Sequence, residues 1–294
     1  MTLKMNTKIY NYADSVCKET LSDILRYGTM DENPRPKYSD GTPAHTISIN
    51  QVMHRYDLSR SQFPVITLRP LAVKSAIREI LWIYQEQSND LDVLKNKYKI
   101  DWWNPWESKD MKGTIGVRYG ETVRKHKLMD NLLDGLINDP FGRRHIISLW
   151  QNSDFEESDG LMPCAFLTMW NVRKDKNGVI YLDMTLIQRS CDYVTAGSIN
   201  AVQYTALLMM VAAACGYKPG VFVHFIQNVQ IYDRHIQAAK SMIKRESISS
   251  PIMELNVEDK VDFYDIKESD FEFVDFPVDH IKLQNPNFKL DLGI

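Results

Sequence analysis

The 294-residue sequence has few cysteines, no long apolar run and no excess of basic charge. Its four cysteines lie far apart, without a CxxC pair or the spacing of a metal finger, which argues against a disulfide framework and favours a reducing compartment. The longest purely apolar run, Ala206–Cys215, is too short to cross a bilayer. The first twenty residues lack the apolar stretch of a signal peptide. We therefore expect a soluble cytoplasmic protein without a membrane partner.

The charge balance argues against a protein whose main task is to bind duplex nucleic acid. The sequence has 35 Lys and Arg residues against 38 Asp and Glu residues, a formal net charge of −3. Duplex binding needs an excess of basic charge, so no dedicated nucleic-acid site is expected. Hydrophobic residues make up 44% of the chain and charged residues 25%, which is close to the average for soluble domains.

Helices and strands are mixed along the chain without regular alternation. Apolar periodicity and end signals predict helices at 12–27, 70–84, 128–138, 200–215 and 233–244. Apolar, β-branched stretches predict strands at 46–58, 145–150, 166–173, 179–188 and 221–231, with Asn177-Gly178 as a hairpin turn. We expect a loop at 29–45, no regular element at 100–120, and short strands and loops after residue 250. This pattern favours an α+β fold, with residues 1–294 in a single large domain.

Two cysteines are candidate nucleophiles. Cys164 lies between a polar loop at 154–160 and an apolar strand, where a thiol can be partly exposed beside charged groups. Cys191, at the end of another strand, is an equally good candidate on position alone. For both cysteines, composition favours the simpler interpretation of a small buried hydrophobic side chain.

Three arginines near these cysteines could bind an anion. Arg143 and Arg144 immediately precede an apolar strand, and Arg189 ends another strand beside Ser190. Arginine is the preferred side chain for bidentate binding of phosphate or carboxylate, although a solvated ion-pairing role explains Arg143 and Arg144 equally simply. A guanidinium near a cysteine would also lower the pKa of the thiol.

An ordered set of motifs resembles the thymidylate synthase family from about residue 12 to Ile294. Arg189-Ser190-Cys191-Asp192, followed by Gly197 and Asn200, is similar to the nucleotide-binding segment, and Pro163-Cys164 stands at the place of the catalytic cysteine. The other matching motifs are Phe63-Pro64, Arg69, Glu79-Ile80-Leu81-Trp82, Trp103, Trp106, Gly116-Val117-Arg118-Tyr119-Gly120, Asp139-Pro140, Arg143-Arg144 and Trp150. The resemblance implies a mixed β-sheet with flanking helices and a homodimer.

The resemblance implies a methyltransferase that converts deoxyuridine monophosphate (dUMP) to thymidine monophosphate (dTMP). The co-substrate 5,10-methylenetetrahydrofolate would give both the carbon and a hydride, and no metal is implied. Position 5 of uracil is a poor nucleophile, so a group must first add at position 6, and Cys164 is the implied nucleophile, with Arg189 suited to keep it a thiolate. Asn200 would pair with N3–H and the neighbouring carbonyl. Glu79 and Tyr119 would order water and move the proton from position 5.

The same resemblance implies how the nucleotide phosphate is bound. Arg189 and Ser190 of one chain would meet the phosphate together with Arg143 and Arg144 contributed across the homodimer interface. Either Arg35 or Lys37 resembles the remaining phosphate ligand, and Arg35 is preferred.

Sugar and folate contacts are implied for a second group of residues. Tyr232 would meet the sugar hydroxyl, and Gln230 stands where the family has a sugar-contacting histidine. Asp192 resembles the residue that hydrogen-bonds the pterin ring, and Trp103 would form part of the apolar wall of that ring. Arg69 and Ile294 belong to the same folate side.

The sequence departs from the family pattern beside the cysteine and before Asn200. Ala165 replaces the usual histidine after the cysteine, so a proton relay would rely on water, Glu79 and Tyr119. The turn at 195–199 also differs from the usual leucine- and proline-bearing turn. Gln230 can still hydrogen-bond a hydroxyl, and none of these changes touches the covalent step.

Two other functions remain open. A pyrimidine hydroxymethylase would share the cysteine, the phosphate site and the folate but transfer no hydride; Asn200 favours uracil over cytosine, and the apolar surroundings of Trp103 favour the synthase. A catalytically inactive relative that binds RNA or protein is the other alternative. The net charge of −3 and the lack of a basic or aromatic stripe argue against it.

Overall fold

The computed structural model describes residues 9–291 and residue 293, which form a mixed β-sheet with helices packed on one face. The strand order is β1-β2-β7-β5-β4-β3, and β6 pairs with β7. The bounds are β1 Thr29–Met30, β2 Thr46–Asp57, β3 Ile146–Ser148, β4 Ala165–Lys174, β5 Ile180–Gln188, β6 Cys191–Asp192 and β7 Lys218–Tyr232. Strands β5 and β7 are parallel, whereas β2–β7, β4–β5 and β3–β4 are antiparallel. This arrangement confirms the predicted α+β class.

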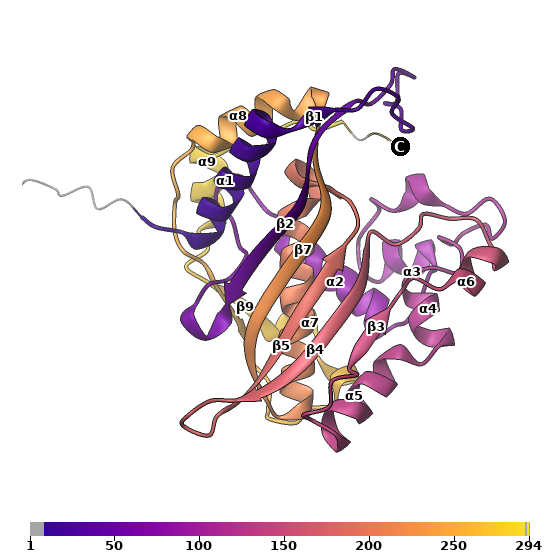
Figure 1. The fold of residues 1–294 in the computed structure, drawn as a ribbon, viewed down its shortest axis with the longest axis vertical. Coiled ribbons are helices and arrows are strands. Elements are labelled where there is room, and N and C mark those ends of the chain that lie inside the picture. The colour runs from indigo at the N-terminus through magenta and orange to yellow at the C-terminus, as the bar shows by residue number, and fades with distance from the viewer. Residues whose placement is uncertain (1–8, 292, 294) are drawn as a thin grey trace, which may run out of the picture.

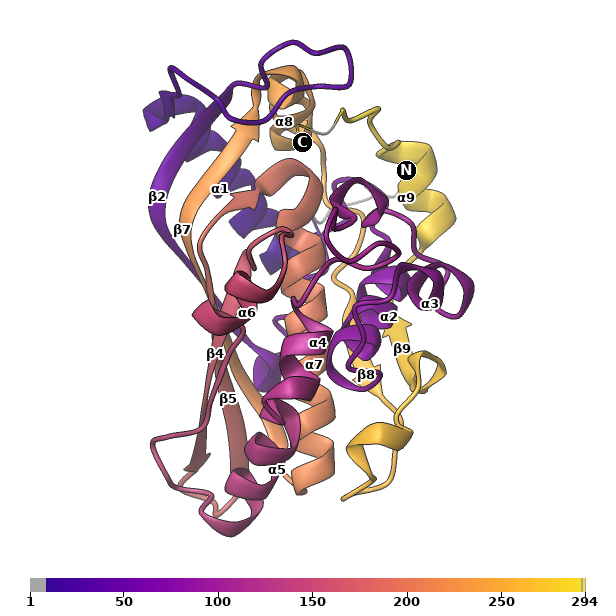
Figure 2. The same ribbon diagram turned by 90° about the vertical axis from the view of Figure 1, so that its right-hand side faces the viewer.

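The helices lie on one side of the sheet, as Figure 2 shows from the edge. Their bounds are α1 Tyr12–Tyr27, α2 Val73–Tyr84, α3 Leu91–Asn96, α4 Gly120–Lys125, α5 Leu128–Asn138, α6 Asn152–Glu157, α7 Ser198–Cys215, α8 Ile236–Lys244 and α9 Val278–Gln284. Strands β8 (Ile252–Leu255) and β9 (Phe271–Val274) form a separate antiparallel pair. The described residues leave the opposite face of the main sheet uncovered.

Helix α7 is the central helix of the core. It packs against α2 on one side and against β5 and β7 on the other, so apolar side chains point in all directions around it. Gly216 ends the helix with φ +74°, a left-handed conformation that glycine adopts without steric cost. The stretch Tyr193–Cys215 is long and apolar enough to span a membrane, but 72% of its most apolar window is buried inside the fold. We therefore assign it as a core helix.

Several predicted bounds differ from the structure for local reasons. The helix predicted from residue 70 begins at Val73, because Ala72 is its N-cap. The segment predicted as a polar loop contains α6, whose side chains are largely exposed and so carry no apolar periodicity. Helix α3, capped by Asp90, and helix α9 were not predicted. The hairpin turn is correct in place but longer than two residues, since the amide of Asp175 donates to the carbonyl of Val179 and leaves three residues between them, with Gly178 at φ +87°.

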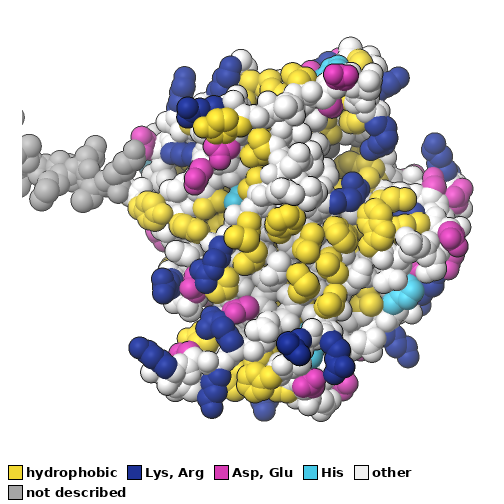
Figure 3. Space-filling model, viewed as in Figure 1, with side chains coloured by type: hydrophobic (Ala, Val, Ile, Leu, Met, Phe, Trp, Pro, Cys, Tyr) yellow, Lys and Arg dark blue, Asp and Glu magenta, His cyan; other side chains and the backbone are white. Residues whose placement is uncertain are grey.

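The uncovered face of the sheet carries apolar side chains, which appear as yellow atoms over the central strands in Figure 3. Met53 on β2, Ile146 on β3 and Met169 on β4 are 63%, 50% and 39% exposed, whereas their chain neighbours His54, Ile147 and Trp170 are buried. An apolar surface on a sheet face is typical of a protein interface.

Candidate active site

A cavity of about 1200 Å³ brings together most of the residues predicted from the sequence. The predicted residues that line it are Arg35, Arg69, Glu79, Trp103, Tyr119, Cys164, Arg189, Ser190, Asp192, Asn200, Gln230 and Tyr232. Of the two alternatives Arg35 and Lys37, Arg35 lines the cavity and Lys37 does not. Ile294 lies outside the described residues. No cluster of three or more metal-ligating side chains occurs in the part of the chain that the structure describes.

Arg143 and Arg144 are the predicted residues that the fold does not bring to this cavity. Both are exposed and immediately precede the edge of the sheet at β3. Within the described part of the chain their side chains form no ion pair, and they do not line the cavity. The cavity of one chain therefore lacks the arginine pair that the sequence resemblance assigns to the phosphate.

Cys164 lies at the turn that leads into β4, and Arg189 holds that turn. The guanidinium of Arg189 donates to the carbonyl oxygens of Pro163 at 2.9 Å and Met162 at 2.6 Å. Burial raises the pKa of the Cys164 thiol, and the positive charges of Arg189 and Arg35 act against that rise. The positive charge of Arg189 thus lowers the pKa of the thiol, as expected from the sequence, but burial raises that pKa by more.

Cys191, the other candidate nucleophile, is less accessible than Cys164. It also lines the cavity, yet it is only 2% exposed, and burial raises the pKa of its thiol well above the usual value. Cys164 is only partly buried. Because a nucleophilic thiol must reach its substrate as a thiolate, the geometry favours Cys164.

Tyr119 lies between Cys164 and Trp103 and contacts both. Its phenolic oxygen accepts a hydrogen bond from the backbone amide of Cys164 at 3.0 Å, and its ring contacts the ring of Trp103 edge to face at 5.1 Å. Its backbone has φ +48°, which costs on the order of 1–3 kcal/mol for a residue other than glycine. Nearby Gly116 has no room for a side chain, since a Cβ there would lie 2.3 Å from the carbonyl oxygen of Asp159. Close packing thus fixes this strained turn.

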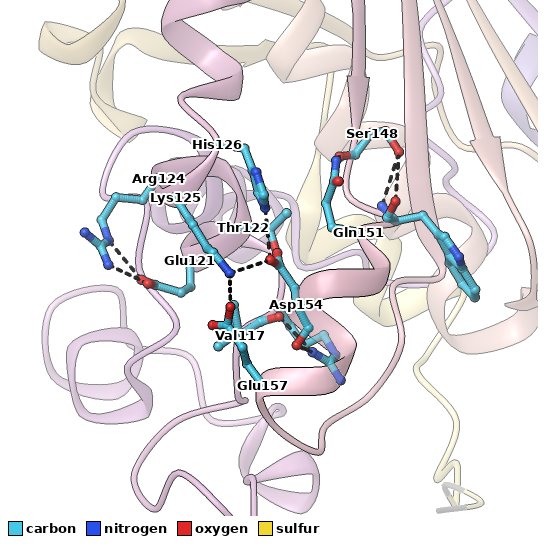
Figure 4. A network of polar contacts seen from close by, with 12 residues as sticks. Val117, Glu121, Thr122, Arg124, Lys125, His126, Ser148, Gln151, Asp154 and Glu157 are labelled. Atoms are coloured by element: carbon cyan, nitrogen blue, oxygen red, sulfur yellow. Dashed lines mark hydrogen bonds and ion pairs between the residues drawn. The ribbon is translucent and has the colours of Figure 1, made fainter.

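The buried carboxylate of Asp154 joins the segment after Tyr119 to the segment before Cys164 through hydrogen bonds (Figure 4). Asp154 on α6 is fully buried and accepts hydrogen bonds from Thr122 at 2.7 Å, Lys125 at 3.0 Å and His126 at 2.9 Å, all from α4 and its C-terminal end. Arg118 donates to the carbonyl oxygens of Asp154 and Ser158, both at 2.9 Å. These contacts hold α6 and the segment before Cys164 against the turn that carries Tyr119.

Glu79 on α2 is a buried carboxyl group between two indoles. Trp102 donates to its Oε2 at 2.7 Å, and Trp103 donates to its Oε1 at 3.0 Å. Burial raises the pKa of Glu79 to about 7, although the indole hydrogen bonds act in the opposite direction. A carboxyl group that titrates near neutral pH is suited to general acid–base catalysis. Although charged side chains on a helix usually face solvent, Glu79 is buried.

Asn200, in the first turn of α7, is held between two glutamines. Its Oδ1 accepts from Gln188 Nε2 at 3.1 Å, and its Nδ2 donates to Gln203 Oε1 at 2.9 Å. Oδ1 therefore keeps a second lone pair, and Nδ2 keeps a second hydrogen, for contact with a ligand. The amide of Asn200 can therefore pair with a neighbouring donor and acceptor at once.

The far side of the cavity offers groups suited to a heteroaromatic ligand. Oδ1 of Asp192 is buried without a hydrogen-bond partner among the described residues, so it can accept from a ring N–H. Arg69 donates to the carbonyl oxygens of Val194 and Thr195 at 3.0 and 2.9 Å, and thereby holds the segment that precedes α7. Asp192 can therefore contact a ligand directly, whereas Arg69 holds the backbone beside it.

Sequence reasoning missed Trp102, Gln188 and Gln203. Gln203 had a usable signal, because a glutamine within the apolar stretch of α7 lies three residues after Asn200 and therefore on the same helix face. A second cavity of about 50 Å³ lies beside Ala165 and is lined by polar groups that include Glu79 and Tyr119. It has room for water, which needs about 10–15 Å³ of probe volume.

Comparison with known proteins gives one consistent result. The family model described as thymidylate synthase matches residues 16–285. Thymidylate synthase of Streptococcus pneumoniae (strain 70585) is 50% identical over 283 residues, which cover 96% of this chain and 99% of that protein. Thymidylate synthase of Lactococcus lactis subsp. cremoris (strain SK11) is 48% identical over 285 residues, with coverage of 96% and 99%. The solved structure of thermostable thymidylate synthase A from Bacillus subtilis superposes with a TM-score of 0.84 at 33% identity, covering 96% of this chain and 99% of that one.

Proposed function

The chain belongs to the thymidylate synthase family, and we propose that it converts dUMP to dTMP with 5,10-methylenetetrahydrofolate as the carbon and hydride donor. The observation that carries the proposal is the placement of the Cys164 thiol in one cavity with the Asn200 amide and the buried Glu79 carboxyl group. A thiol, an amide that reads a pyrimidine edge and an acid–base group together meet the needs of addition to a pyrimidine ring.

Cys164 forms the covalent bond. Its Sγ adds to carbon 6 of the uracil, which moves electron density onto carbon 5 and the carbonyl oxygen at position 4. Asn200 donates to that oxygen as charge develops there, and a donor fixed in advance stabilises the charge without reorganisation. Carbon 5 bonds to the one-carbon unit of the folate and loses its proton, hydride transfer from the folate completes the methyl group, and the Sγ–carbon 6 bond breaks to free the Cys164 thiolate as dihydrofolate and dTMP leave.

Glu79 and Tyr119 handle the proton that carbon 5 must lose. Burial keeps Tyr119 protonated, because it raises the pKa of the phenol well above the usual value, so the phenol orders water rather than acting as a strong base. Glu79 titrates near pH 7 and exchanges protons through water in the small cavity beside Ala165. Water there takes the place of a titratable side chain at position 165.

The nucleotide is anchored through its phosphate and sugar. Arg35, Arg189 and Ser190 bind the phosphate within one chain. The partner subunit's Arg143 and the partner subunit's Arg144 complete the site in a homodimer, which forms through the uncovered apolar face of the sheet. Gln230 and Tyr232 bind the sugar hydroxyl.

The folate binds on the other side of the cavity. Trp103 packs against the pterin ring, Asp192 accepts from its ring N–H, and Arg69 and Ile294 complete this side. The proposal takes residues 1–294 as one catalytic domain in the cytoplasm, with no membrane or dedicated nucleic-acid partner.

An assay of the folate product tests this function against its alternatives. The protein is incubated with dUMP and 5,10-methylenetetrahydrofolate, and dTMP and both reduced folates are quantified. The proposal predicts dihydrofolate in a one-to-one ratio with dTMP. Tetrahydrofolate with a hydroxymethylated nucleotide would identify a hydroxymethylase, and the absence of any product would identify a binding protein.

A further inference from the structure

Two buried histidines lie behind Asn200, and the reaction proposed above does not use them. His54 on β2 and His224 on β7 are paired in the register of these neighbouring strands, with ring centroids 6.2 Å apart. They are 6% and 0% exposed. Nε2 of His54 lies 2.9 Å from the hydroxyl of Thr20, whereas Nε2 of His224 lies 2.7 Å from Oε1 of Gln188. Only His224 thus connects directly to the active-site amides.

The partners of Gln188 determine which nitrogen of His224 carries the proton. Both hydrogens of Gln188 Nε2 are used, since this atom donates to the carbonyl oxygen of Ser190 at 2.9 Å and to Asn200 Oδ1 at 3.1 Å. Its Oε1 is an acceptor, so Nε2 of His224 must be the donor. Nδ1 of His224 is buried without a partner among the described residues, which suits a bare nitrogen. Burial lowers the pKa of His224 well below the usual value, so the ring is neutral.

The hydrogen bonds from His224 onward all point in one direction. His224 donates to Gln188, Gln188 donates to Asn200, and Asn200 donates to Gln203. The Asn200 amide therefore offers its second lone pair on one side and its second N–H on the other. Uracil presents a donor at N3 and an acceptor at position 4, whereas cytosine presents an acceptor and a donor. The direction of the chain thus decides which pyrimidine Asn200 complements.

We propose that His224 is a positioning residue that fixes the amide orientation of Asn200 through Gln188 and thereby sets the preference for uracil over cytosine. The oxygen and nitrogen ends of an amide have similar size, so packing alone does not orient a glutamine. The carbonyl oxygen of Ser190 selects the nitrogen end of the Gln188 amide and the Nε2–H of His224 selects its oxygen end, so the reversed orientation would leave buried groups unpaired at both ends. This inference rests on the part of the proposed function in which Asn200 reads the pyrimidine edge.

Three variants separate positioning from packing. His224→Leu removes the donor, His224→Gln keeps an N–H near the position of Nε2, and His54→Leu changes an adjacent buried histidine that does not contact Gln188. The dissociation constants of dUMP and deoxycytidine monophosphate are measured for each protein by calorimetry. We expect His224→Leu to reduce the preference for dUMP at least about fivefold, because one polar mismatch replaces a satisfied pair. The preference should stay near that of the unmodified protein in His224→Gln and His54→Leu.

An unchanged preference in His224→Leu, or an equal loss in His54→Leu, would overturn the inference. So would an unmodified protein that binds both nucleotides equally. An unmodified protein that forms no dTMP, but whose binding preference depends on His224, would instead remove the proposed reaction and leave this inference standing.

The tautomer of His224 gives a test that needs no variant to fold. Ring ¹⁵N chemical shifts of the unmodified protein should show a protonated Nε2 and a bare Nδ1 at pH 7. A proton on Nδ1, or on both nitrogens, would overturn the inference, because Nδ1–H has no acceptor and the chain would lose its fixed direction. Through-bond correlation of each imidazole ring to its own backbone assigns the signals in the unmodified protein.

Discussion

The phenolic oxygen of Tyr119 accepts a hydrogen bond from the backbone amide of Cys164, with the two atoms 3.0 Å apart. This contact ties the group that orders water to the chain segment that carries the nucleophile, although 45 residues separate them in the sequence. It also occupies one lone pair of the phenol, so the O–H proton is directed to another acceptor. The position of the thiol and the direction of the phenol proton therefore depend on each other.

We expect Tyr119→Phe to lower kcat by about 10²-fold or more while the KM for dUMP changes little, since a single acid–base group contributes roughly 10²–10⁴-fold. The phenylalanine keeps the ring contact with Trp103 and loses only the hydroxyl group. Steady-state kinetics measures both parameters. A variant with normal kcat would exclude Tyr119 from proton transfer.

Glu79 should make the stability of the protein depend on pH in a defined direction. Burial raises the pKa of the folded-state carboxyl group from 4.5 to about 7, so the folded state binds this proton more tightly than the unfolded chain. The stabilising contribution is complete below about pH 4.5 and is lost as the pH rises through 7.

Relative to Glu79→Gln, the unfolding free energy of the unmodified protein should therefore fall between pH 5 and pH 8, by up to about 3 kcal/mol. Urea unfolding of both proteins at the two pH values measures this difference. The substituted amide also changes the hydrogen bonds to the two indoles, but that effect on the unfolding free energy does not depend on pH and cancels when the two pH values are compared. A difference that does not vary with pH would show that Glu79 is not held as the neutral acid.

Two inactive variants should complement each other if the active sites are shared. Arg143 lies outside the cavity of its own chain, so a Cys164→Ala chain can still lend Arg143 to a partner. After subunit exchange with Arg143→Ala, the mixed dimer contains one site with both the cysteine and the arginine. We expect recovery of up to about half the activity per mixed dimer. No recovery after confirmed exchange would contradict the shared site.

Asn200→Asp tests recognition of the pyrimidine at the site itself. A protonated aspartic acid can donate to N3 of cytosine and accept from its amine, so the kcat/KM ratio of uridine to cytidine nucleotide should fall at least about tenfold. If Asn200 only caps α7, aspartate serves equally well and the ratio stays unchanged. Measurement of kcat/KM for both nucleotides distinguishes the two roles.

Local patterns predicted the helices and strands whose ends carry chemical signals. Helix α1 has the predicted bounds, because Asn11 caps its start and Gly28 its end. Helix α6 could not be predicted, since its stability comes from the contacts of Asp154 with α4, which lies about thirty residues earlier.

The site was predictable as a set of residues but not as an arrangement. The burial of Glu79 depends on two indoles from a segment without regular structure, and no periodicity in α2 reveals it. The chain from His224 through Gln188 to Asn200 joins β7, β5 and α7. Its direction depends on three amide and imidazole orientations that only the folded structure defines.

A trapped adduct tests the covalent role of Cys164 most directly. A fluorine at position 5 of dUMP cannot leave as the proton does, so addition of the thiol at carbon 6 should stop at a stable complex with the folate. Mass spectrometry of the digested protein should then place the nucleotide on the peptide that contains Cys164. Attachment to Cys191, or no attachment while dTMP is formed from dUMP, would contradict the account.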